Sequence, residues 1–191
     1  MASSISQGII IFLNGTSSAG KSTIATELQQ SLPQPFMHIS LDTYLNQLSP
    51  LVLNNQQLMI SLLPMLLDGF NYSVAAIASK GNNCIIDHVL QEPEWVHPCV
   101  EAFEDLEVYF IKVYCPLEIL VEREKVRGDR HIGMAEYQYS RVHHYNSYDA
   151  EVDTSVLSAK ECAQSIINLL DSSQKPTAFE QIRKEIQKDG F

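Results

Sequence analysis

The sequence predicts an α/β fold in which a five-stranded parallel sheet is flanked by helices. Five short apolar runs alternate with stretches of helical spacing, which is the order found in a parallel sheet wound with right-handed crossovers. The first run, 8–13, is a continuous series of β-branched and large apolar residues, typical of a strand covered on both faces.

The expected elements follow one another with short connections. After the first strand, Ile24, Ala25 and Leu28 recur at helical spacing behind a Gly/Ser-rich turn. The predicted strands are 8–13, 36–40, 82–87, 106–115 and 150–153, and the predicted helices are 22–31, 72–80, 94–103, 116–127 and 158–170.

Three segments lie outside this alternation. Residues 45–67 are rich in Leu and Met but contain Pro50 and Pro64, which predicts short helices that either fill the core or line an apolar substrate pocket. The polar, Arg-bearing stretch 128–147 predicts a mobile lid over about 127–147. We therefore expect one domain over 1–175 and an appended C-terminal helix over 176–191.

Composition excludes several classes of function. The 191 residues include 13 Lys+Arg and 23 Asp+Glu, and this net charge of -10 argues against sequence-independent nucleic-acid binding. The apolar run near the N-terminus is far shorter than the roughly 20 residues of a membrane helix, so no membrane span is expected. The four cysteines form no C-x-x-C pair and predict reduced thiols in a cytoplasmic protein.

Residues 15–22, GTSSAGKS, match the phosphate-loop pattern G-x-x-x-x-G-K-[ST] between a predicted strand and a predicted helix. In this pattern backbone N–H groups face the phosphates, Lys21 neutralises phosphate oxygens, and the Ser22 hydroxyl binds Mg²⁺. ATP and Mg²⁺ are therefore the expected cofactors. The predicted nucleotide-binding residues of the loop are Gly15, Thr16, Ser17, Ser18, Ala19, Gly20, Lys21, Ser22 and Thr23.

The rest of the chain favours a kinase among phosphate-loop proteins. No N-K-x-D sequence for guanine recognition occurs, and the chain is too short for a typical ring-forming ATPase with its helical lid domain. A small-molecule or nucleotide kinase is therefore the favoured class, and the expected fold is the P-loop kinase fold.

Two carboxylates follow predicted strands at the edge where ligands bind. Asp42 comes directly after the second strand and is predicted to be the catalytic base, with a helix N-cap as the alternative. Asp87 ends the third strand and is predicted to contact Mg²⁺ or substrate, with capping of the next segment as the alternative.

Two arginines border the expected lid. Arg127 and Arg130 are predicted to bind the nucleotide, and Arg130 to act in catalysis, because phosphoryl transfer depends on positive charge around the transferred group. The alternative is a solvated surface cluster in which Glu122, Glu124 and Asp129 pair with these arginines.

These motifs, in order, resemble the chloramphenicol phosphotransferase family. The resemblance rests on 13–22, Asp42, 85–87, 127–135 and 148–154. It implies a fold like that of shikimate and nucleoside-monophosphate kinases, transferring the ATP γ-phosphate to a drug hydroxyl. It places Asp42 on the catalytic base, Lys21 and Ser22 on phosphate and Mg²⁺, and Arg127 and Arg130 on the lid.

The segment that would form the acceptor pocket departs from this pattern. His88 stands where a second acid is expected after Asp87, Arg141 replaces an apolar lid residue, and the stretch between Asp42 and Asp87 is shorter. That stretch contains Asp68 and Lys80 but no Arg, which favours an apolar or aromatic acceptor.

The sequence therefore predicts an ATP-dependent O-phosphotransferase with a small-molecule hydroxyl acceptor. Two alternatives stay open at this point: a kinase of a metabolite such as a nucleoside, sugar or nucleotide sugar, and a non-catalytic ATP-binding module. The sequence does not predict an oligomeric state.

Overall fold

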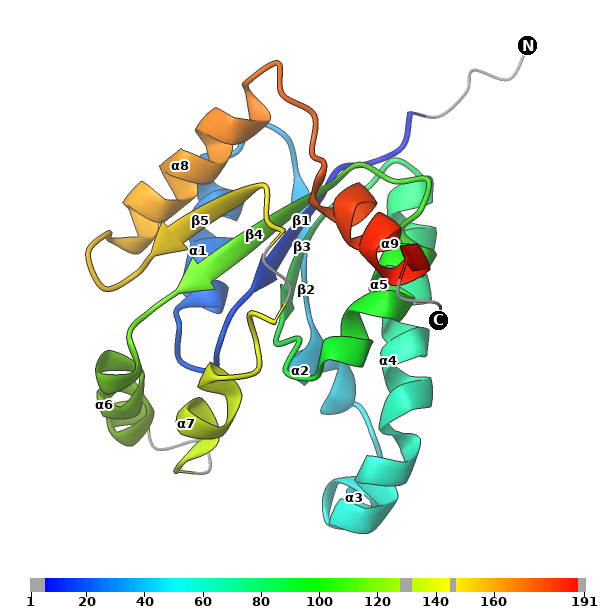
Figure 1. Ribbon diagram of the computed structural model, residues 1–191, viewed down its shortest axis with the longest axis vertical. Helices are drawn as coiled ribbons and strands as arrows, with labels where there is room; N and C mark the ends of the chain where they lie inside the picture. The colour runs from blue at the N-terminus through cyan, green and yellow to red at the C-terminus, as the bar shows by residue number, and fades with distance from the viewer. Residues whose placement is uncertain (1–5, 128–131, 145–146, 189–191) are drawn as a thin grey trace.

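The computed structural model describes residues 6–127, 132–144 and 147–188. Its strands form a five-stranded parallel sheet in the order β2-β3-β1-β4-β5, which confirms the predicted fold class (Figure 1). The strands are β1 (Ile10–Asn14), β2 (Phe36–Ser40), β3 (Asn83–His88), β4 (Val108–Tyr114) and β5 (Ala150–Asp153).

The central strand β1 determines where a ligand can bind. It pairs with β3 on one side and β4 on the other, and all five of its residues are buried. The chain passes from β1 toward the β2 edge and later crosses to β4 on the other side. In parallel α/β sheets, such a reversal opens a crevice at the carboxyl ends of the strands. The loop that follows β1 emerges at this point.

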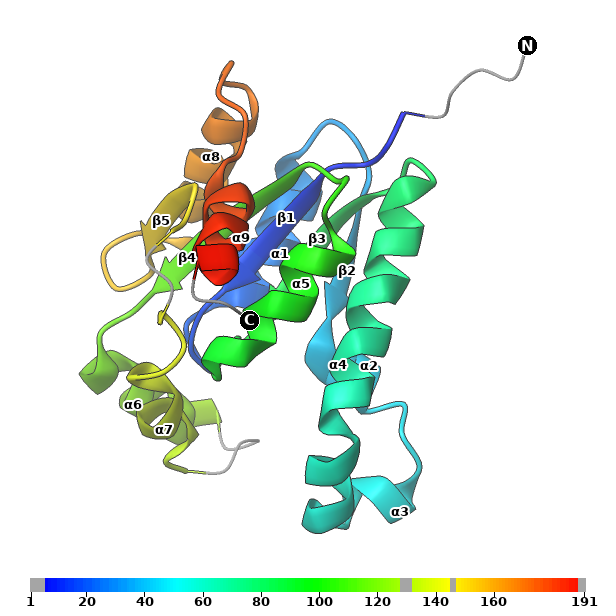
Figure 2. The same ribbon diagram turned by 45° about the vertical axis from the view of Figure 1, so that its right-hand side comes forward.

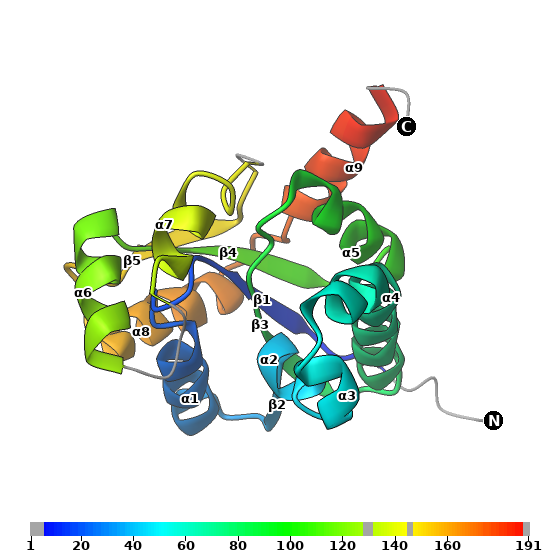
Figure 3. The same cartoon turned by 90° about the horizontal axis from the view of Figure 1, so that it is seen from below.

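Helices cover both faces of the sheet (Figure 3). Ile11 and Leu13 of β1 face one core, which includes residues of α1, α6 and α8, whereas Ile10 and Phe12 face the other, which includes residues of α4, α5 and α9. This alternation is the two-residue period of a strand. These helices are α1 (Lys21–Ser31), α4 (Gln56–Ser79), α5 (Val96–Ala102), α6 (Leu117–Arg127), α8 (Ala159–Leu170) and α9 (Ala178–Lys188).

The segment 45–67 differs from the prediction of short helices. Two short helices come first, α2 (Leu41–Leu45) and α3 (Pro50–Leu53). They are followed by α4, one helix of 24 residues that runs through Pro64 and also includes most of the helix predicted over 72–80. Asn55 caps this helix by accepting a hydrogen bond from the Leu58 N–H at 3.1 Å. A proline removes one helical hydrogen bond, and the packing of the C-terminal half of α4 on the sheet compensates for that loss.

By length and apolar composition alone, α4 could cross a membrane. Its C-terminal half instead buries Leu67, Phe70, Val74 and Ala78 in the core against the sheet. Core helices of soluble proteins are often equally long and apolar, so the composition of α4 is weak evidence for a membrane span. The N-terminal half and α3 extend beyond the sheet, as Figure 2 shows.

The C-terminal helix α9 packs directly on the main core. Phe179 lies against the rings of Phe12, Phe103 and Phe110, with centroid distances of 5.9, 6.3 and 5.1 Å. The Arg183 guanidinium donates to the Val100 carbonyl of α5 at 2.8 Å. The helix predicted from the spacing of Phe179 and its neighbours is therefore present and shares the core of the sheet.

The close approach of the loop after β1 to β4 makes Gly15 necessary. A Cβ at this position would lie 2.3 Å from the Val113 carbonyl oxygen and 3.1 Å from the Val113 Cβ. We expect Gly15→Ala to lower the free energy of unfolding by about 2 kcal/mol, measured by urea denaturation, because β4 is held between β1 and β5 and cannot move away. The control is Gly69→Ala in α4, where the added Cβ would lie 2.8 Å from the hydroxyl at the tip of the Tyr44 side chain and meets no backbone of another element. Equal losses in the two variants would contradict this explanation.

Candidate active site

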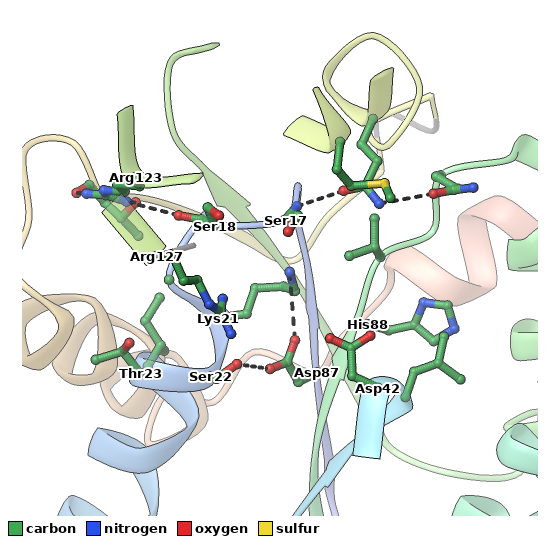
Figure 4. A pocket seen from close by; sticks show the side chains of 18 of the residues that line it. Ser17, Ser18, Lys21, Ser22, Thr23, Asp42, Asp87, His88, Arg123 and Arg127 are labelled. Carbon is green, nitrogen blue, oxygen red and sulfur yellow. Dashed lines mark hydrogen bonds and ion pairs between the residues drawn. The ribbon is translucent and has the colours of Figure 1, made fainter. Parts of the chain in front are cut away.

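A cavity of about 810 Å³ lies at the carboxyl end of the sheet and contains most of the predicted site (Figure 4). It brings together residues from the loop after β1, from α2, from the end of β3 and from α6. Arg130 lies outside the described residues. The predicted residues that line the cavity are Ser17, Ser18, Gly20, Lys21, Ser22, Thr23, Asp42, Asp87 and Arg127.

Three predicted nucleotide-binding residues do not line the cavity but support the loop from behind. Gly15 packs against β4, and Thr16 and Ala19 are buried with exposed fractions of 3% and 0%. The Thr16 carbonyl accepts from the Ala19 N–H at 3.1 Å, which closes the turn. These residues shape the loop, so any contact they make with a nucleotide would come from the backbone.

The loop turns its backbone toward the cavity through two left-handed residues. Ser18 has φ 65° and Gly20 has φ 92°, and α1 begins at the next residue. The first N–H groups of a helix have no partner within the helix, so they are available to an anion. The Lys21 ammonium donates to the carbonyls of Gly15 at 2.9 Å and Thr16 at 3.1 Å, which holds its charge across the loop.

Two buried hydroxyls in the phosphate loop have unused hydrogen-bonding capacity. Among the described residues, the Oγ atoms of Ser17 and Ser18 have no hydrogen-bond partner. Buried polar atoms are nearly always paired, and an unpaired hydroxyl beside an ammonium suits an anionic oxygen. The loop therefore fits a chain of phosphates.

The Mg²⁺ positions predicted at Ser22 and Asp87 lie side by side. The Ser22 hydroxyl donates to Asp87 Oδ2 at 2.5 Å. Across the described residues, no group of three His, Cys, Asp or Glu side chains could hold a metal. Mg²⁺ is commonly bound through one or two protein oxygens with phosphate and water completing the shell, and this pair fits that pattern. The Asp87 carboxylate faces α1. It does not cap the next segment, because Glu92 is the N-cap residue of the short helix that follows.

The Asp87 carboxylate is held in its ionised form. Burial by itself would raise its pKa, but Lys21, His38 and the Ser22 hydroxyl together hold the pKa well below its usual range. The Lys21 ammonium lies 3.7 Å from Oδ1, and His38 Nε2 lies 3.7 Å from Oδ2. A carboxylate this acidic is a poor proton acceptor at neutral pH.

Asp42 is the second carboxylate among the described residues that line the cavity. It lies in the first turn of α2, where Ser40 and not Asp42 occupies the N-cap, so the capping alternative is wrong. Asp42 is exposed and lines the cavity, facing it from the side opposite the phosphate loop (Figure 4).

The cavity also contains an arginine that the sequence reasoning missed. Arg123 lies one helical turn before Arg127 on α6, and both line the cavity. Arg123 donates to the Thr154 hydroxyl at 2.9 Å and to the Thr154 carbonyl at 2.7 Å. The four-residue spacing from Arg127 was a signal that would have found it, because such residues share one face of a helix.

Glu124, named in the alternative interpretation as a partner for the arginines, bonds the backbone at the start of the next helix. It is buried, and its carboxylate accepts from the N–H groups of Gly133 at 2.8 Å and Ala135 at 2.9 Å. These two residues begin α7 (Met134–Tyr139), the helix found within the predicted lid. Glu124 therefore fixes the start of α7 against α6.

The wall opposite the phosphate loop is apolar. Residues 43–67 contain no Asp, Glu, Lys, Arg or His, and this stretch supplies part of the cavity wall. The segment also packs against the core through Leu45 and Leu63, so it both fills the core and lines the cavity. The apolar residues of this wall are Leu41, Leu45, Met59, Leu63 and Trp95.

His88 lies at the edge of the cavity inside an aromatic cage. Its ring is 5.8 Å from Phe12, 5.8 Å from Phe70 and 6.4 Å from Trp95, measured between centroids. Burial lowers the pKa of His88 to about 4, with smaller effects from nearby charges that include Lys21. The imidazole is therefore neutral at physiological pH.

This low pKa predicts a loss of stability in acid. A histidine that titrates at 6.5 when unfolded and near 4 when folded disfavours the folded state as pH falls between those values. We expect the wild type to lose roughly 3 kcal/mol more of its unfolding free energy than His88→Phe between pH 7 and pH 4. Chemical denaturation at a series of pH values measures this difference. Parallel pH profiles for the two proteins would contradict the assignment.

Comparison with solved structures confirms the kinase fold. The APS kinase CysC of Mycobacterium tuberculosis, solved with AMPPNP and APS, superimposes with a TM-score of 0.66 and 17% identity, over 87% of this chain and 99% of that chain. Shikimate kinase from Acinetobacter baumannii, solved with shikimate, gives a TM-score of 0.60 and 15% identity, over 84% and 92% of the two chains. The sheet and its flanking helices are those of the P-loop kinases.

Sequence comparison is more specific. A Mycobacterium tuberculosis (strain H37Rv) protein named "Putative O-phosphotransferase Rv2636" is 27% identical over 200 residues, covering 93% of this chain and 89% of its own length. The family model described as chloramphenicol phosphotransferase-like protein matches residues 8–171, which include the phosphate loop, Asp42, Asp87 and α7. With most of its length matched by that model, the chain belongs to the chloramphenicol phosphotransferase-like family of P-loop phosphotransferases.

Proposed function

We propose that this protein transfers the γ-phosphate of ATP to a hydroxyl group of a small, uncharged and largely apolar molecule. One observation carries the proposal: the phosphate loop and the Asp42 carboxylate line the same cavity, and the wall beside Asp42 is apolar. The phosphate side suits ATP. The other side suits an uncharged acceptor, because residues 43–67 contain no cationic side chain that could pair with an anionic one.

The residues divide the chemistry between them. The acceptor oxygen attacks the γ-phosphorus, its proton passes to Asp42, and ADP leaves with the bond between the β- and γ-phosphates broken. Lys21 and the N-terminus of α1 stabilise the negative charge on the phosphates. Ser22 and Asp87 would hold Mg²⁺, which neutralises charge on the β- and γ-phosphate oxygens when it is bound.

The remaining end of the cavity is suited to the nucleoside part of ATP. Arg123, Leu157 and Ala159 line it beyond the phosphate loop. Arg123 is fixed by its two hydrogen bonds to Thr154, and a guanidinium plane can stack on a purine ring. This arrangement would put the γ-phosphate at the Asp42 end.

Replacement of the proposed base should separate binding from transfer. We expect Asp42→Asn to bind the ATP analogue AMPPNP with wild-type affinity and to lose at least about 100-fold in acceptor-dependent ADP release, because the acceptor proton has no recipient. A panel of hydroxylated antibiotics that includes chloramphenicol, nucleosides and sugars supplies the acceptors, and Asp68→Asn on α4 is the control. Unchanged turnover in Asp42→Asn would contradict the assignment, and no acceptor-dependent ADP from the wild type would favour a binding module.

Removal of the loop ammonium should weaken nucleotide binding. We expect Lys21→Met to reduce AMPPNP affinity by about 10- to 100-fold in calorimetry, the range for a lost hydrogen bond to a charged group. Lys112→Met is the matched control, because Lys112 pairs with Glu151 at 3.0 Å and does not line the cavity. An AMPPNP affinity in Lys21→Met equal to that of Lys112→Met would rule out this loop as the phosphate site.

A further inference from the structure

Three segments that are distant in sequence meet through a chain of two hydrogen bonds. The Ser17 N–H in the phosphate loop donates to Gln138 Oε1 of α7 at 2.8 Å, a bond drawn at Ser17 in Figure 4. Gln138 Nε2 then donates to Gln91 Oε1, in the segment between β3 and η1 (Pro93–Trp95), at 3.0 Å. Both glutamines line the cavity, and Gln138 is 7% exposed.

The chemistry of this chain fixes the orientation of both amides. A backbone N–H can only donate, so the Gln138 atom that it meets must be the oxygen. The Gln138 nitrogen can only donate in turn, so the Gln91 oxygen must accept. The Gln91 NH₂ group is left to donate elsewhere, and none of the residues that the structure describes accepts from it.

The backbone around both glutamines is held by one buried side chain. Asn14, at the end of β1, accepts from the Leu90 N–H at 2.9 Å and donates to the Val142 carbonyl at 2.9 Å. Leu90 precedes Gln91, and the Val142 N–H bonds the Gln138 carbonyl at 3.0 Å. Asn14 is 1% exposed, so the frame that carries both amides is rigid.

We propose that the Gln91 NH₂ group is a hydrogen-bond donor to the acceptor molecule and that Gln138 is the positioning residue that orients it. This inference rests on the proposed function. It specifies the substrate class further: an uncharged apolar alcohol that carries a second oxygen able to accept a hydrogen bond. Because the same Gln138 amide bonds the phosphate loop, acceptor recognition is tied to the loop that holds the phosphates.

Two probe alcohols test this recognition. They are 1-phenyl-1,3-propanediol, which has a second oxygen, and 3-phenyl-1-propanol, which lacks it. Calorimetry with the Mg·AMPPNP-loaded protein measures their affinities in the wild type, in Gln91→Leu and in Gln138→Leu. Gln164→Leu, on the exposed side of α8, is the matched control.

We expect the wild type and the control to bind the diol more tightly than the mono-alcohol by roughly 3- to 10-fold, the range for one neutral hydrogen bond. Both cavity variants should lose this preference because they weaken the binding of the diol. AMPPNP affinity should be unchanged in Gln91→Leu, which does not contact the phosphate loop. A purely structural role would weaken both alcohols together, and urea denaturation measures the stability of each variant.

The opposite results overturn the inference. These are equal binding of the two alcohols by the wild type, binding of neither alcohol, or a preference for the diol that survives in Gln91→Leu. The proposed transfer has a separate readout: a protein that binds the diol with this preference but releases no ADP from any acceptor contradicts the transfer, and the recognition by Gln91 still stands.

Discussion

The end of β1 is the fixed point on which the site depends. This strand is buried on both faces, and Gly15 follows it so close to β4 that no side chain fits. Asn14 uses its one amide to hold the segment before η1 and the segment after α7. The phosphate loop, the acceptor side and the predicted lid are thereby positioned against a single strand end.

The placement of charge explains how an acidic chain can hold a triphosphate. The net charge of -10 is spread over the molecule, whereas Lys21, Arg123 and Arg127 meet in one cavity with the N-terminus of α1. Asp87 is ionised beside Lys21, 3.7 Å from its ammonium, and offsets part of this positive charge. The uncharged stretch 43–67 supplies much of the opposite wall, which separates a site for phosphates from a site for an apolar molecule.

Local patterns in the sequence were sufficient for the sheet and the phosphate loop. Buried parallel strands read as continuous apolar runs, and the loop residues form a contiguous motif whose spacing reflects its geometry. The prediction of short helices holds for α3 but was wrong from residue 56 onward, because Pro64 was taken as a break. Packing of Leu67 and Phe70 on the sheet holds α4 together across this proline. Tertiary packing overrode local propensity there.

The polar partners within the site were harder to predict for a different reason. Gln91 and Gln138 lie 47 residues apart, and a glutamine in a polar stretch has no periodicity that marks it as buried. The Glu124 carboxylate accepts hydrogen bonds from two backbone N–H groups, which sequence patterns do not reveal. The position of Asp42 at the cavity could be predicted because a carboxylate directly after a strand lies at the ligand-binding edge of a parallel sheet.

The fate of the terminal phosphate tests the central claim most directly. Protein, Mg²⁺ and ATP labelled with ³²P in the γ-phosphate are incubated with uncharged aromatic alcohols, including chloramphenicol, and the products are separated by thin-layer chromatography. Transfer through the cavity predicts label in a phosphomonoester of an alcohol, formed in step with ADP. Label that stays in ATP, or that appears only as inorganic phosphate with every alcohol, would contradict the claim.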